Sequence, residues 1–88
     1  MISQNQINEI AVKIKTLGLD DAMVSVLREH YQPMHFTYCM DDDLPNNTPV
    51  LESKDFNLYL IDGREHCLCL TNNFEVATGI VVAEIIPD

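Results

Sequence analysis

The stretch FNLYLIDGREHCLCLT, residues 56–71, gives the strongest indication of the architecture of this 88-residue chain. Two runs that alternate apolar with other side chains, 56–60 and 65–71, flank the pair Asp62-Gly63. Such alternation is typical of β-strands, and an Asp-Gly pair between two such runs is typical of a hairpin turn. We therefore predict two antiparallel strands joined by a tight loop.

The length of this loop determines which side chains share a face. A two-residue loop splits the leucines of the two strands between opposite faces. A three-residue loop, 61–63, pairs Leu58 with His66 and keeps the large apolar side chains together. We predict the three-residue loop, because one face then offers a continuous apolar surface to the core. The reverse face carries Tyr59, Cys67 and Cys69.

Two helices are predicted before the strands. Ser3 and Gln6 form a capping-box pattern ahead of an apolar stripe with helical spacing, which predicts a helix over 4–17. Asp20 is a suitable N-cap for a second helix over 21–31. Because the link between them is short, the two helices should form an αα-hairpin.

The rest of the chain favours strands and one long loop. Alternation over 34–40 predicts a strand, and the Pro- and Asn-rich segment 42–53 predicts a loop. The β-branched run over 78–86 predicts a final strand. A helix over 74–83 is the alternative, but Gly79 and the Ile-Val-Val run disfavour it.

These elements give the order ααββββ, which is typical of the α+β class. We expect a single domain, 1–88, in which the N-terminal αα-hairpin packs on one face of a four-stranded antiparallel sheet.

The charge limits the classes of partner. Lys and Arg total 5 and Asp and Glu total 14, so the formal net charge is −9. Residues 41–88 hold ten of the acidic residues and two of the basic ones. This balance argues against binding to nucleic acids or to anionic membranes, which attract clustered Lys and Arg. The N-terminus lacks the pattern of a secretory signal, so we expect a cytoplasmic protein with reduced thiols.

The run Asp41-Asp42-Asp43 follows a predicted strand. Adjacent carboxylates bind Mg²⁺ or Ca²⁺ in some loops, but Pro45 and Asn46 stand where an EF-hand needs an oxygen ligand and a glycine. We therefore reject an EF-hand and leave open either a loose cation site or a solvated acidic loop. The same run is suited to recognising a basic partner protein, together with Tyr59 on the outer sheet face.

A second set of residues has metal-ligating chemistry. Thiolates and imidazoles bind zinc and iron, and the set consists of Cys39, His66, Cys67 and Cys69. A single Cys-x-Cys pair is a weak motif, because alternate strand residues lie about 6.5–7 Å apart. Small side chains packed in a sheet explain the same pattern, and both interpretations stay open.

Catalysis receives little support from the sequence. His30, His35 and His66 are general-base candidates, yet no nucleophile elbow or glycine-rich phosphate loop accompanies them. We expect His30, on the apolar face of the second helix, to be a hydrogen-bonded core residue, and His66 beside Leu58 likewise.

The segment FTYCMDDD at 36–43, the hairpin LYLIDGREHCLCLT and the tail ATGIVVAEI resemble a small, uncharacterised bacterial protein family over about the last 50 residues. This resemblance implies no activity, cofactor or site residue.

Taken together, the sequence predicts a small, acidic, non-enzymatic interaction module without a cofactor. Its expected partner is a basic protein, and a homodimer through an exposed sheet edge or face is a further option. The alternative function is a thiol-based metal-binding or redox protein that holds zinc or iron.

Overall fold

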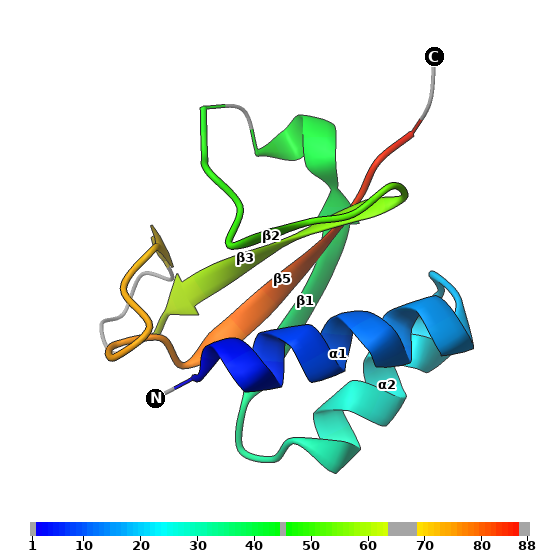
Figure 1. Ribbon diagram of the computed structural model, residues 1–88, viewed down its shortest axis with the longest axis horizontal. Coiled ribbons are helices and arrows are strands. Elements are labelled where there is room, and N and C mark those ends of the chain that lie inside the picture. The colour runs from blue at the N-terminus through cyan, green and yellow to red at the C-terminus, as the bar shows by residue number, and fades with distance from the viewer. Residues whose placement is uncertain (1, 45, 64–68, 87–88) are drawn as a thin grey trace.

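The computed structural model describes residues 2–44, 46–63 and 69–86 of the chain. Two helices lie on one side of a five-stranded sheet, which confirms the α+β class (Figure 1). The elements are α1 (Gln4–Leu17), α2 (Asp21–His30), β1 (His35–Met40), the short 3-10 helix η1 (Asp41–Asp43), β2 (Leu51–Glu52), β3 (Phe56–Asp62), β4 (Cys69–Thr71) and β5 (Gly79–Glu84).

Helix α1 begins and ends where its local signals indicate. The Ser3 hydroxyl accepts a hydrogen bond from the Gln6 amide at 3.1 Å, and the Gln6 side chain accepts one from the Ser3 amide at 2.9 Å. At the other end, Gly18 has a φ of +92°, and its amide donates to the Ile14 carbonyl at 2.8 Å. The reciprocal cap and the positive-φ glycine thus fix both ends of the helix. Its buried face consists of Ile7, Ile10, Ala11 and Ile14.

Helix α2 also has the expected cap, since an Asp20 carboxylate oxygen accepts a hydrogen bond from the Met23 amide at 2.8 Å. It ends at His30, one residue before the predicted end. The prediction that His30 is a core residue is wrong: His30 is exposed and its ring meets the edge of the Tyr31 ring. His30 is in line with buried Met23 around the helix axis, but it is the last residue of α2, nearly one turn beyond the last buried residue, Leu27.

The sheet is mixed rather than antiparallel, which corrects the predicted topology. Its strand order is β1-β5-β3-β2, and β4 also pairs with β3. β1 runs parallel to β5, and the other pairs are antiparallel. The extra strand, β2, lies inside the segment that we predicted to be a loop. It was missed because two residues are too few for alternation to show.

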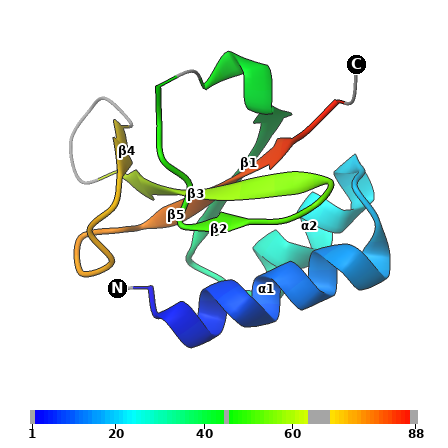
Figure 2. The same cartoon turned by 45° about the horizontal axis from the view of Figure 1, so that its top comes forward.

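Both faces of the sheet are buried. On the helix face, Leu58 and Leu60 of β3 and Ile80 and Val82 of β5 pack against α1 and α2. The second face carries a smaller cluster of Tyr59, Ile61, Val81 and Ala83, packed with Cys39, Leu44 and Leu70. Figure 2 shows the green segment after β1 on the side of the sheet opposite the helices. Burial on two faces explains the continuous apolar run of β5. The predicted final strand is therefore confirmed, and the alternative helix is not formed.

The hairpin register differs from the predicted one. Ile61 pairs with Leu70 and Asp62 pairs with Cys69, whereas the predicted register paired Leu58 with His66; residues 64–68 lie outside the described residues. This register places Leu70 on the second face and Cys69 on the side of Leu60. The prediction failed because it assumed a single apolar face, whereas Ile61 and Leu70 are both accommodated on the second one.

We predict that Gly79→Ala destabilises the fold by about 2 kcal/mol or more, as overpacking of a rigid site does. A Cβ at Gly79 would lie 2.6 Å from the His35 carbonyl oxygen and 2.8 Å from the His35 Cβ, so β1 and β5 must separate. Urea unfolding measures the change, with Thr37→Ala on exposed β1 surface as the control. An unchanged unfolding midpoint for Gly79→Ala would contradict the close approach.

Candidate functional site

The acidic run is anchored to the second sheet face by its first residue. One carboxylate oxygen of Asp41 accepts hydrogen bonds from the Tyr59 hydroxyl at 2.7 Å and from the Asn57 side-chain amide at 3.0 Å. Tyr59 is 3% exposed, so the expectation that it forms part of an outer contact surface is wrong. Burial raises the pKa of Tyr59, and the hydrogen bond to Asp41 raises it further. Asp41 and Tyr59 therefore hold η1 in place, while Asp42 and Asp43 are exposed.

Further carboxylates gather at the same end of the sheet, around the Tyr38 phenol. The Tyr38 hydroxyl donates a hydrogen bond to the Glu84 carboxylate. Burial raises the pKa of Tyr38 to about 12, with contributions from Glu84, Asp21 and Asp20. Since β1 and β5 are parallel, their carboxyl ends meet here, beside the start of α2. We call this region the acidic end; it consists of Asp20, Asp21, Asp42, Asp43 and Glu84.

Two exposed apolar side chains belong to residues close to Glu84 of the acidic end, one in register and one in sequence. Met40, the last residue of β1, is 41% exposed and pairs in register with Glu84. Ile86, two residues after Glu84, is 52% exposed. Only the run 41–43 was predicted from the sequence, because Glu84 joins it through the parallel pairing of β1 with β5, and Asp20 and Asp21 join it through the packing of α2. The available signal was the Asp20-Asp21 pair at a helix start, which we interpreted only as a cap.

The described cysteines do not lie on one face. Cys39 is half-buried in the second-face cluster with Tyr59. Cys69 is exposed and pairs with Asp62, which the alternation of β3 places on the helix side. His66 and Cys67 lie outside the described residues, so their role in a zinc or iron site stays a prediction. Among 2–44, 46–63 and 69–86, no three His, Cys, Asp or Glu side chains are grouped to hold a metal ion.

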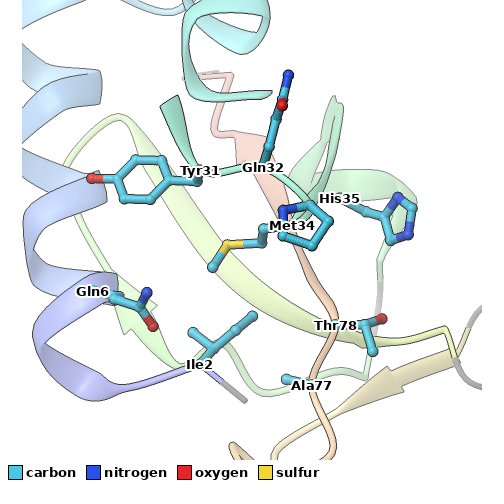
Figure 3. A pocket seen from close by; sticks show the side chains of 9 residues that line it. Ile2, Gln6, Tyr31, Gln32, Met34, His35, Ala77 and Thr78 are labelled. Atoms are coloured by element: carbon cyan, nitrogen blue, oxygen red, sulfur yellow. The ribbon is translucent and has the colours of Figure 1, made fainter. Parts of the chain in front are cut away.

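A pocket of about 460 Å³ opens at the other end of the sheet, between the start of α1 and the α2–β1 connection (Figure 3). Ile2, Met34 and Ala77 form its apolar lining. Two of its polar groups are engaged within the chain: the Tyr31 hydroxyl donates to Glu9 at 2.6 Å, and the Thr78 hydroxyl accepts from the Gly63 amide at 2.9 Å. His35 lines the pocket too, but no carboxylate does among the described residues, so this part of the lining offers no histidine–carboxylate pair.

Tyr59→Phe removes the hydroxyl group that anchors Asp41, and we expect a loss of stability of about 1 kcal/mol. Hydrogen exchange at the Leu44 amide, which donates to the Asp41 carbonyl at 3.0 Å, should become faster. The matched control is Tyr31→Phe, which loses a similar bond to Glu9 far from η1. Equal protection of the Leu44 amide in both variants would show that Tyr59 does not anchor the turn.

Cys39 should react slowly with iodoacetamide at neutral pH, because burial raises the pKa of its thiol, followed by the charges of Asp43 and Asp41. Asp43→Asn lowers that pKa and should speed alkylation of Cys39 by about two- to fivefold. Peptide mass analysis follows the rate at Cys39 separately from other thiols. The neighbouring Asp42→Asn serves as the control, and equal rates in the two variants would rule out the effect of Asp43.

No helix within the described residues has the length and apolar character needed to cross a membrane.

The comparisons with known proteins identify the family alone. No curated protein and no solved structure matches the chain. One family model matches residues 9–85, well beyond the 50 residues on which the resemblance rested, and the chain therefore belongs to this family of unknown function, DUF6129.

Proposed function

We propose that the protein is a small non-enzymatic accessory module that binds a basic partner protein through its acidic end. The observation that carries this proposal is that the three carboxylates of the run 41–43 differ in their contacts. Asp41 is bonded to Tyr59 and Asn57, and this anchor presents Asp42 and Asp43 to solvent from a fixed turn. A preorganised charged group loses less conformational freedom on binding than one on a flexible loop.

The composition of the acidic end supports a protein partner. Its carboxylates attract Lys and Arg side chains and steer their approach. Exposed Met40 and Ile86 add apolar surface, which supplies affinity that exposed charges alone do not. A segment that combines basic and apolar side chains is therefore the partner chemistry that fits.

Quantitative capture from lysate tests the proposal. The immobilised wild-type chain is compared with Asp42→Asn/Asp43→Asn and with Glu29→Gln/Glu75→Gln, a control that removes the same charge at exposed sites outside the acidic end. We expect basic proteins that bind the wild type and the control but are at least about tenfold depleted with the Asp42/Asp43 variant, a difference of about 1.4 kcal/mol. Their capture should also weaken as salt rises.

Two results would contradict the proposal. One is that no protein distinguishes the Asp42/Asp43 variant from the Glu29/Glu75 control, because the charges would then act only through net charge and solubility. The other is a partner that is retained equally at low and high salt, since contacts between exposed charges are screened.

A further inference from the structure

The outer side of β1 is a regular sheet edge on which the structure describes no further strand. At the other side of the sheet, the strands β2 and β4 are short, with two and three residues. β1 instead has six residues, all in unbroken register with β5, and contains no Pro or Lys. Within the ranges that the structure describes, no strand pairs with its outer side (Figure 1). Proteins usually protect edges with short strands, bulges, Pro or Lys, and β1 has none of these.

The backbone groups on this edge follow from the parallel pairing. The His35 amide donates to the Thr78 carbonyl at 3.2 Å, so the residues of β1 with odd numbers bond to β5. The amides and carbonyls of Phe36, Tyr38 and Met40 therefore point outward. The Arg28 guanidinium covers one of these groups, because it donates to the Phe36 carbonyl at 3.0 and 3.3 Å.

Charges of opposite sign lie at the two ends of this edge. Arg28, near the end of α2, reaches Phe36 at the start of β1. Asp21, near the start of α2, acts on the Tyr38 phenol at the far half of β1. The two residues are seven apart, which is about two helical turns, so they project from the same side of α2. The edge is thus basic at one end and acidic at the other.

We propose that a second copy of this chain docks on the edge, with the two β1 strands antiparallel about a twofold axis at Tyr38. This register pairs Tyr38 with Tyr38 of the second copy and Phe36 with its Met40, so the outward backbone groups of the edge meet partners. The twofold axis brings Arg28 of each copy to Asp21 of the other. Because the interface is twofold symmetric, the contact between Arg28 of one copy and Asp21 of the other forms twice.

The charge arrangement favours this occupant over an extended basic peptide. A peptide that is basic along its length would meet the Arg28 guanidinium at one end of β1, where it is repelled. Asp21 belongs to the acidic end as well, but the variants that test the proposed function change only Asp42 and Asp43 and those that test the dimer change only Asp21 and Arg28, so the two proposals can fail separately.

Charge exchange between Arg28 and Asp21 tests the dimer. Sedimentation velocity over a concentration series should show a monomer–dimer equilibrium for the wild type. Arg28→Glu alone and Asp21→Lys alone each place like charges at both contacts, and we expect dimer dissociation constants raised about tenfold or more.

A mixture of the two variants restores opposite charges at both contacts. The carboxylate introduced by Arg28→Glu in one copy meets the ammonium group introduced by Asp21→Lys in the other. At the second contact, the unchanged Asp21 of the first copy meets the unchanged Arg28 of the second. A heterodimer should therefore form at the concentrations at which the wild type dimerises.

Glu29→Lys is the matched control, because it makes the same charge change as Asp21→Lys at an exposed position on another side of α2. It should leave dimerisation unchanged, and circular dichroism confirms that each variant is folded. A wild-type chain that stays monomeric throughout the series overturns the proposal. Charge variants that dimerise like the wild type, or a mixture that stays monomeric, overturn it as well.

Discussion

The two central strands, β3 and β5, are covered on both faces, and this double burial shapes the rest of the fold. They pair over Phe56–Ile61 and Gly79–Glu84, so successive side chains enter the helix-side core and the second-face cluster in turn. Two helices cover one face. The other needs its own cover, which the segment after β1 supplies through Leu44 and through the hydrogen bonds of Asp41. The run 41–43 therefore helps to cover the core, and it also contributes exposed charges to the protein surface.

This constraint also separates what the sequence predicts from what it does not. The ends of α1 depend on a Ser3–Gln6 cap and on Gly18, signals that lie within one turn of the helix, and they were predicted correctly. The hairpin register depends on whether Ile61 and Leu70 can be buried on the second face. Nothing within residues 56–71 shows that such a place exists, because its other walls come from Val81, Ala83 and Leu44.

The candidate site follows the same rule. The run 41–43 was visible in the sequence as a cluster, but its division into one anchoring and two exposed carboxylates was not, because the anchor is Tyr59 on another strand. Similarly, Glu84 and Asp21 are distant in sequence from Tyr38 and approach it only through the parallel pairing of β1 with β5 and the packing of α2. Alternation alone placed Tyr59 on an exposed face, since it does not reveal what covers that face.

The proposed dimer and the proposed partner site are mutually compatible because of the direction of β1. An antiparallel pairing points the carboxyl ends of the two β1 strands away from each other, so Asp42 and Asp43 of the two copies lie at opposite ends of the joined sheet. The interface uses Asp21, one carboxylate of the acidic end, together with Arg28, and it leaves those four carboxylates in solvent. Such an assembly presents two identical acidic turns, and a partner with two basic segments of matching spacing would bind it more tightly than it binds one copy, since the second contact becomes intramolecular.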